Sequence, residues 1–364
     1  MTGTTPGPDS TMPVEHSHES LHDITSVAHV IRDAIREAKQ LVILTHGNPD
    51  ADAVASALSM RTLCTKLGVS PALTVSGDGS LPANLVFLKD ADIIAQTDDT
   101  AIKDADLIIF VDCADASRLG PAYYRMTDEL ERPRRTINID HHVTNTRFAQ
   151  INLVVPNSAS TAEILTHLYE ALDIEIDPDT ATTMLAGLYG DTLGLRTPST
   201  TPSSLRTSAQ LLDAGADLDT IVDMLFRLKP YSTICLWSEV LKTTQWRGAL
   251  IWASIDQGML DRSEADRSEA EGIVNFLAGT IGARAAVMLY AESWGWRVSM
   301  RTLADDVDVA EMLKRYDGGG HPRAAGAKLA AGEIARDAFL SDMARLLGPR
   351  TDVPTMVTPG DEPV

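Results

Sequence analysis

The first half of the chain alternates short, uninterrupted apolar runs with longer stretches of helical periodicity. Strands that are apolar along their whole length and separated by helices predict a parallel sheet covered on both faces. We therefore expect an α/β domain, in which ligands bind outside the carboxyl ends of the strands. The strand-length runs occupy 41–44, 71–75, 107–111 and 136–139, and the helical patterns occupy 53–67, 160–172 and 180–188.

A different pattern predicts a smaller α+β domain in the C-terminal part. Strands are expected at 249–255, 285–291 and 296–302, with a helix from about 263 to 277. The turn at 292–295 is short enough to join the last two strands as an antiparallel hairpin. We expect the active site in the cleft between the two domains. The predicted ranges are a disordered leader 1–20, a catalytic domain 21–205, a helical linker 206–243, a substrate-binding domain 244–347 and a tail 348–364.

Charge and composition limit the partners and the compartment. Lysine plus arginine number 31 and aspartate plus glutamate 51, which gives a net charge of −20. This charge repels long polyanions and predicts no long nucleic-acid partner, whereas a short phosphorylated substrate needs only metal ions or a few arginines. No run reaches the roughly 18 apolar residues of a membrane helix, so no membrane partner is expected. The three cysteines match no disulfide framework or zinc spacing, which favours a cytoplasmic protein.

Acidic and imidazole side chains follow several of these predicted elements. The sequence H-x-x-x-D-x-D starts at His46, directly after the first apolar run, and Asp112 follows the third run. Asp140-His141-His142 follows the fourth run, and Gly190-Asp191-Thr192 follows the last helical pattern. If the strands are neighbours, six side chains converge on one crevice: His46, Asp50, Asp52, Asp112, His141 and Asp191.

Such a crevice predicts a site for two divalent metal ions. Four carboxylates in one pocket raise each other's pKa, and cations between them relieve the repulsion. Two ions about 3.5–4 Å apart can activate water and stabilise the leaving oxygen of a displacement at phosphorus. Carboxylate oxygens combined with two imidazoles favour Mn²⁺, with Co²⁺, Fe²⁺ or Zn²⁺ as alternatives.

Five motifs, taken in chain order, resemble those of the DHH phosphoesterases. The first four are H-x-N-P-D-x-D, the strand-end D, D-H-H and G-D-T. The fifth, Gly318 to Gly326, reads GGGHPRAAG and resembles the GGGH-x-x-A-A-G motif of the DHH-associated substrate domain. The length and two-domain layout resemble the group of oligoribonucleases (nanoRNases) that are also phosphatases of 3′-phosphoadenosine 5′-phosphate (PAP).

The resemblance implies roles for the acidic and imidazole residues. His142 would face the scissile phosphate as a proton donor, and Asp140 would orient a histidine. Asp112 would bridge the two metal ions. One ion would be held by His46, Asp50 and Asp112, and the other by Asp52, Asp112, His141 and Asp191.

In the second domain, the resemblance implies contacts to the substrate phosphate or base. Arg301 ends a predicted strand, and its guanidinium matches the geometry of a phosphate. Arg297 has the same strand parity as Arg301, so it could share that face. The glycines would let the backbone approach the substrate closely. The implied substrate-binding residues are Arg301, Gly318, Gly319, Gly320 and His321.

The implied function is hydrolysis of short oligoribonucleotides to 5′-mononucleotides and of PAP to AMP, by an enzyme for which the family makes a homodimer plausible. Three alternatives stay open. They are a phosphodiesterase of cyclic or linear dinucleotide second messengers, a manganese inorganic pyrophosphatase and a non-catalytic nucleotide sensor. The GGGH element and Arg301 speak against the pyrophosphatase, and the complete set of metal ligands speaks against the sensor.

Overall fold

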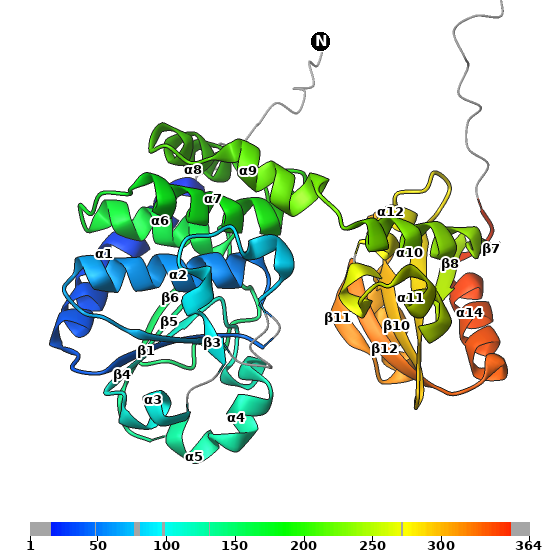
Figure 1. Ribbon diagram of the computed structural model, residues 1–364, viewed down its shortest axis with the longest axis horizontal. Coiled ribbons are helices and arrows are strands. Elements are labelled where there is room, and N and C mark those ends of the chain that lie inside the picture. Colours follow the sequence, from blue (N-terminus) through cyan, green and yellow to red (C-terminus); the bar gives the residue numbers. More distant parts are fainter. Residues whose placement is uncertain are drawn as a thin grey trace, which may run out of the picture. The chain divides into compact units, whose positions relative to one another are not determined.

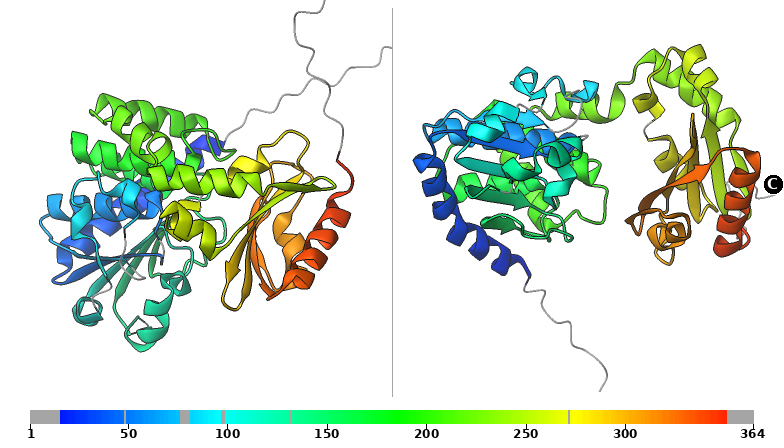
Figure 2. Two further views of the ribbon diagram at one scale, coloured as in Figure 1. Left: turned by 45° about the vertical axis from the view of Figure 1, so that its right-hand side comes forward. Right: turned by 90° about the horizontal axis from the view of Figure 1, so that it is seen from below.

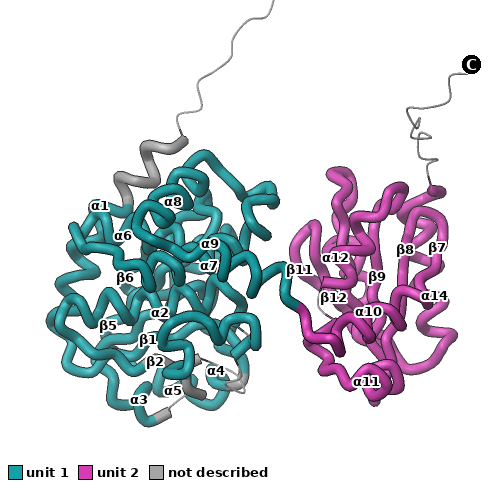
Figure 3. The backbone as a smooth tube through the Cα atoms, turned by 45° about the horizontal axis from the view of Figure 1, so that its top comes forward, with its two compact units in different colours: residues 1–228 teal, residues 229–364 magenta. Residues whose placement is uncertain are grey.

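A computed structural model describes residues 16–350 except 48, 76–80, 97–98, 131 and 271. The chain forms two compact units, 1–228 and 229–364, shown in different colours in Figure 3. The predicted leader and tail lie largely outside the described residues, although α1 (His16–Glu37) begins inside the predicted leader. The predicted active-site cleft between the two domains stays a prediction.

The first unit is built on a six-stranded parallel sheet. Its strand order is β3-β2-β1-β4-β5-β6, and every neighbouring pair is parallel. From β1 the chain adds strands toward one edge of the sheet as far as β3, and from β4 it adds them toward the opposite edge. In a doubly wound sheet, ligands bind beside the carboxyl ends of the two strands at which this direction changes, here β1 and β4. The strands are β1 (Leu41–Thr45), β2 (Ala72–Val75), β3 (Ala95–Gln96), β4 (Leu107–Val111), β5 (Arg135–Asp140) and β6 (Ile151–Val154).

Helices cover both faces of this sheet, as Figures 1 and 2 show. Alternate residues of β1 enter two cores, because successive side chains of a strand point to opposite faces. Leu41 and Ile43 join one core, and Val42 and Leu44 join the other. The first core is covered by α1, α2 (Ala51–Lys66), α6 (Thr161–Ala171), α7 (Pro178–Thr192), α8 (Pro202–Asp213) and α9 (Leu218–Val222), and the second by α3 (Asp99–Asp104), α4 (Pro121–Arg125) and α5 (Thr127–Leu130).

Helices α2 and α7 form a closely packed antiparallel pair. A Cβ atom on Gly190 would lie 2.5 Å from the Cβ of Ala51, and one on Gly187 would lie 2.9 Å from the Cβ of Ala55. Only glycine permits this approach without moving the helices. The packing brings the C-terminal turn of α7 beside the N-terminus of α2, where predicted ligands occur in both helices.

The second unit is a smaller α+β domain around a six-stranded mixed sheet of order β11-β12-β10-β9-β8-β7. Only β8 and β9 pair in parallel, and the predicted hairpin of β9 and β10 is confirmed. The strands are β7 (Gln245–Arg247), β8 (Leu250–Ile255), β9 (Ala285–Glu292), β10 (Gly295–Arg301), β11 (Gly319–His321) and β12 (Ala324–Ala330). One face packs on α10 (Tyr231–Lys242), α11 (Gln257–Ser263) and α12 (Ile273–Ala278), and the other on α13 (Val309–Leu313) and α14 (Glu333–Leu347), which Figure 2 shows beside the strands.

The predicted fold class, a parallel α/β domain followed by a smaller α+β domain, is confirmed. The continuous helix predicted at about 263–277 is wrong. Helix α11 ends at Ser263 because Glu264 adopts a left-handed backbone with φ of 51°, and Gly272, with φ of 90°, precedes α12. The stretch 206–243, predicted as a linker, is divided between the units, since α8 and α9 pack in the first and α10 packs on β8 in the second. Across the described part of the chain, no helix is long and apolar enough to span a membrane.

Candidate active site

Predicted ligands from three strand ends and from α7 lie together at the switch point of the parallel sheet. Asp112, just after β4, lies at the centre. Its Oδ2 is 3.5 Å from Nε2 of His46, which follows β1, and its Oδ1 is 3.7 Å from Nε2 of His141, which follows β5. His141 Nε2 is also 3.1 Å from Oδ2 of Asp191 in the last turn of α7.

The potential ligand atoms fall into three groups, each spanning no more than 4.8 Å. Two of these groups together contain all six predicted metal ligands: one is His46, Asp50 and Asp112, and the other is Asp52, His141 and Asp191. The third group is Asp112, His141 and His142. Asp112 and His141 therefore each belong to two groups, which places them where the two proposed ion positions would meet.

The two imidazoles of His46 and His141 are oriented by backbone carbonyls. Nδ1 of His46 lies 3.0 Å from the carbonyl oxygen of Gly47, and Nδ1 of His141 lies 3.3 Å from that of Ser158. When Nδ1–H donates to a carbonyl, Nε2 carries the lone pair, as in histidines that bind metals. Both Nε2 atoms face carboxylates, and this arrangement is favourable only with a proton or a cation between them. The donor set therefore fits a metal ion.

The carboxylates at this edge of the sheet repel one another. Burial of the Asp50 carboxyl group and the charges of Asp112 and Asp191 raise its pKa to about 6, although the residue as a whole is exposed. Fully buried Asp52 has its pKa raised well above the usual value by burial and the same two charges. Burial alone would lower the pKa of His141, but the hydrogen bond to Asp191 and the charge of Asp52 raise it to about 10. The acidic and imidazole groups are thus positioned to bind a cation.

Asp112 occupies an unusual backbone conformation. Its φ of 54° lies in the left-handed region, which residues other than glycine seldom adopt. Its amide donates a hydrogen bond of 3.0 Å to the carbonyl of Ile139 in β5, and the residue is only 2% exposed. Such conformations persist where the surroundings enforce them, and they are common at functional sites.

The N-terminus of α6 contacts the site, which the sequence analysis did not predict. Backbone amides of Thr161 and Ala162 donate to the two carboxylate oxygens of Asp52, at 2.7 and 2.9 Å. The Thr161 hydroxyl donates to Oδ1 of Asp112 at 3.0 Å. Amides at a helix N-terminus favour negative charge, so they hold Asp52 in place. The only sequence signal was the S-x-x-E pattern from Ser160, which is typical of a helix start.

His142 is oriented by the carboxylate two residues before it. Its Nδ1 lies 2.8 Å from Oδ1 of Asp140, a fully buried residue. The Asn145 side-chain amide donates to Oδ2 of Asp140 at 2.5 Å and to the Asn138 side chain at 2.7 Å. Asp140 thus fixes the orientation of the His142 ring through Nδ1. No pattern in the sequence singled out Asn145.

In the second unit, three of the predicted substrate residues, Arg301, Gly319 and His321, lie along one face of the sheet. Arg301 pairs with Ala324, which pairs with His321, so the three residues share a row across β10, β12 and β11. The adjacent row consists of Ser299, Gly326 and Gly319. A pocket of about 780 Å³ opens over this face, with a lining that includes Arg297, Ser299, Arg301, Gly318, Gly319, Gly326 and Lys328. His321 is exposed and does not line it.

The three consecutive glycines differ in what the fold requires of them. A Cβ on Gly318 would lie 2.6 Å from the carbonyl oxygen of Gly326, and one on Gly320 would collide with the carbonyl oxygen of Ala324. By contrast, a Cβ on Gly319 would meet nothing within 4 Å. Packing of the strands therefore accounts for Gly318 and Gly320. Packing does not account for Gly319, where a side chain would extend into open space.

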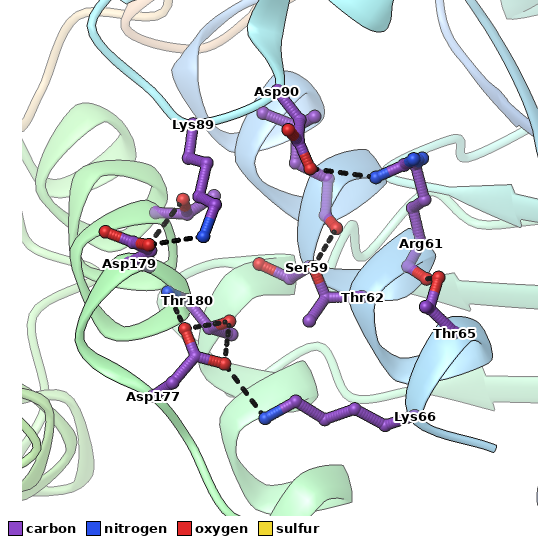
Figure 4. A pocket seen from close by; sticks show the side chains of 12 residues that line it. Ser59, Arg61, Thr62, Thr65, Lys66, Lys89, Asp90, Asp177, Asp179 and Thr180 are labelled. Carbon is purple, nitrogen blue, oxygen red and sulfur yellow. Dashed lines mark hydrogen bonds and ion pairs between the residues drawn. The ribbon is translucent and has the colours of Figure 1, made fainter. Parts of the chain in front are cut away.

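The first unit contains a pocket at the other end of the α2–α7 pair, away from the candidate site (Figure 4). It measures about 210 Å³ and contains three basic side chains. Each base already pairs with an acid, so the pocket is internally neutralised. The pairs are Arg61 with Asp90 at 2.9 Å, Lys66 with Asp177 at 2.9 Å and Lys89 with Asp179 at 2.5 Å.

Comparison with known proteins places both units in known families. Residues 40–188 match the DHH family, N-terminal domain, and residues 250–348 match the DHHA1 domain. The bifunctional oligoribonuclease and PAP phosphatase NrnA of Thermus thermophilus is 31% identical over 291 residues, or 79% of this chain and 84% of the relative. The probable bifunctional oligoribonuclease and PAP phosphatase NrnA of Streptococcus mutans is 25% identical over 296 residues, or 80% and 90%.

A solved structure has the same fold. The crystal structure of an exopolyphosphatase-related protein from Bacteroides fragilis matches with a TM-score of 0.80 and 22% identity, over 88% of this chain and 97% of that one. At this identity the match shows the fold alone. The two domain matches and the relative in Thermus thermophilus show the family. The chain belongs to the DHH family of phosphoesterases and carries a DHHA1 domain.

Proposed function

We propose that this chain hydrolyses short oligoribonucleotides to 5′-mononucleotides and converts PAP to AMP. The observation that carries the proposal is the position of Asp112, which lies between a ligand group that includes His46 and one that includes His141. This arrangement is suited to phosphate ester hydrolysis with metal ions. The names of the relatives in Thermus thermophilus and Streptococcus mutans support the choice of substrates.

Two divalent ions, with Mn²⁺ as the native metal, complete the proposed site. Bound there, they would supply an activated water as nucleophile and positive charge for the leaving oxygen. Carboxylate oxygens with two imidazole nitrogens suit Mn²⁺ better than Mg²⁺, which prefers oxygen ligands alone. The proposed ligands are His46, Asp50 and Asp112 for one ion, and Asp52, Asp112, His141 and Asp191 for the other.

His142 is the proposed proton donor. Asp140 accepts its Nδ1–H, and Asn145 fixes the second oxygen of Asp140, so the ring has a defined orientation. The remaining nitrogen, Nε2, would donate to a phosphate oxygen of the substrate. Asp140 acts through His142 and is therefore a positioning residue.

The open sheet face of the second unit is the proposed nucleotide-binding surface. Arg301 and His321 lie in one row of this face, and Gly319 lies in the adjacent row, where a Cβ atom would meet nothing within 4 Å. Arginine binds phosphate through parallel hydrogen bonds, and an exposed backbone accepts close approach of a planar base. The net charge of −20 repels a long polyanionic strand, which favours short substrates.

A substrate panel tests the proposal. The full-length chain is assayed with Mn²⁺ on PAP, dinucleotides, five-mers, linear and cyclic dinucleotide messengers and pyrophosphate. We expect AMP from PAP and 5′-mononucleotides from chains of two to five residues. Faster hydrolysis of pyrophosphate than of a dinucleotide would instead identify a pyrophosphatase, and the absence of turnover on every substrate would identify a sensor.

The substitution Arg301→Ala tests the proposed surface. Loss of a charged hydrogen bond to phosphate should raise KM about 10–100-fold, with a small change in kcat. Arg323→Ala is the matched control, because Arg323 lies in the glycine motif but pairs with Asp305 and the carbonyl of Leu303. Equal KM values for wild type and Arg301→Ala would remove Arg301 from the substrate site.

A further inference from the structure

One short segment contacts three of the six proposed metal ligands. The Ser158 carbonyl lies 3.3 Å from Nδ1 of His141. The amides of Thr161 and Ala162 donate to Asp52, and the Thr161 hydroxyl donates to Asp112. Contacts to Asp52, Asp112 and His141 therefore come from residues 158–162, which contribute none of the proposed ligands themselves.

Glu163 ties this segment together. Its buried carboxylate accepts from the Ala159 amide at 2.7 Å and from the Ser158 hydroxyl at 3.0 Å. Its own amide donates to the Ser160 hydroxyl oxygen at 3.1 Å, which caps α6. These bonds fix the first turn of α6, so Thr161 presents its hydroxyl to Asp112 from a rigid position.

The Asp112 carboxylate has two oxygens with different surroundings. Oδ2 faces His46, whereas Oδ1 faces His141 and accepts the Thr161 hydroxyl at 3.0 Å. Because the Thr161 hydroxyl bonds to just one of the two oxygens, it sets the rotation of the carboxylate about its Cβ–Cγ bond. With that rotation set, one oxygen points toward each group of potential ligands.

We propose that Thr161 is a positioning residue of the metal centre, whose hydroxyl aligns the Asp112 carboxylate for two cations at once. The inference deepens the proposed metal site and rests on it, but it does not depend on which phosphate ester is cleaved. Partners that orient a metal ligand typically change metal affinity about 10–100-fold when removed. Thr161 is fully buried, so the aligned geometry is present before any substrate arrives.

Three variants of the full-length chain test the inference. Thr161→Val keeps the shape and removes the hydroxyl, and Thr161→Ser keeps the hydroxyl and removes the methyl group. Thr166→Val is the matched control, because Thr166 is fully buried in the same helix and donates to the Ala162 carbonyl at 3.0 Å. Mn²⁺ binding is measured by calorimetry without substrate, and thermal unfolding of the metal-free proteins is measured in parallel.

Thr161→Val should bind at least one Mn²⁺ ion about 10–100-fold more weakly. Thr161→Ser and Thr166→Val should keep the wild-type affinity, whatever their melting temperatures. Wild-type affinity in Thr161→Val, or equal weakening in Thr161→Ser, would overturn the inference. If Thr161→Val does not fold, Thr161→Ala replaces it in the same comparison. A wild-type chain that binds no Mn²⁺ would be a failure of the proposed metal site itself.

Discussion

The two ends of the α2–α7 pair place acidic side chains in opposite electrostatic settings. At one end, Asp50 and Asp52 from the start of α2 meet Asp191 from the end of α7, and among the described residues none of the three pairs with a lysine or arginine. At the other end, Asp177 pairs with Lys66, and Asp179 pairs with Lys89 (Figure 4). The same two helices thus carry compensated acids at one end and uncompensated acids at the other.

The pKa values express this difference. Burial alone would raise the pKa of Asp177, but hydrogen bonds from Lys66 and Thr180 lower it to about 2. Burial and neighbouring carboxylates raise the pKa of Asp50 to about 6. At the end where Asp177 caps α7, a lysine side chain of the protein balances the charge of the acid. Where cations are absent, the acids are suited to bind them from solution.

The largest expected effect on activity comes from replacing an aspartate by alanine near each end of the α2–α7 pair. Asp112→Ala should abolish hydrolysis, because it removes the carboxylate between the two ligand groups. Asp177→Ala should keep kcat and lower the free energy of unfolding by about 0.5–2 kcal/mol, since Asp177 caps α7. Assays with Mn²⁺ and denaturant titrations measure both. Substantial activity in Asp112→Ala, or a large loss of kcat in Asp177→Ala, would break the comparison.

Proton release is the next effect. In the metal-free protein the raised pKa of His141, about 10, keeps the imidazole protonated near neutral pH. A metal ion must displace that proton, so Mn²⁺ affinity should rise about tenfold per pH unit between pH 7 and 9. Calorimetry in buffers of different ionisation enthalpy counts the released protons. A pH-independent affinity would contradict the expected competition, and Asp177→Ala should behave like the wild type.

The smallest effect concerns the compensated end. Because the pKa of Asp177 is lower in the folded chain than the roughly 3.9 of an unfolded aspartate, its ion pair stabilises the fold above about pH 4. That contribution is lost as the pH falls from about 4 toward 2. Lys66→Met should remove no more than about 1 kcal/mol at pH 7 and flatten this part of the acid dependence. An acid dependence identical to that of the wild type would show that Lys66 does not set the pKa of Asp177.

The sequence was most informative where the pattern is local. The apolar runs located β1, β4 and β5, and acidic or imidazole residues at their ends predicted the cluster around Asp112, because carboxyl ends of parallel strands meet at one edge. Strand β3 spans only Ala95–Gln96 and β11 only Gly319–His321, too short for any periodicity. The break after Ser263 depends on a left-handed Glu264, for which the sequence gives no warning.

Contacts between distant segments could not be predicted in this way. Thr161 donates to a carboxylate 49 positions away, and Asn145 donates a hydrogen bond to Asp140. Threonine and asparagine are common polar residues, and neither Thr161 nor Asn145 belongs to a metal-ligand or catalytic motif of the sequence. The glycine motif gave three equivalent candidates, whereas strand packing separates Gly319 from Gly318 and Gly320. Only the positions of neighbouring atoms make that distinction.

The most direct test of the central claim is a count of Mn²⁺ ions bound per chain, by equilibrium dialysis and elemental analysis, in wild type and Asp112→Ala. The account predicts two ions in the wild type and the loss of both in the variant, because Asp112 is a proposed ligand of both ions. A single ion in the wild type, or two ions retained by Asp112→Ala, would contradict it.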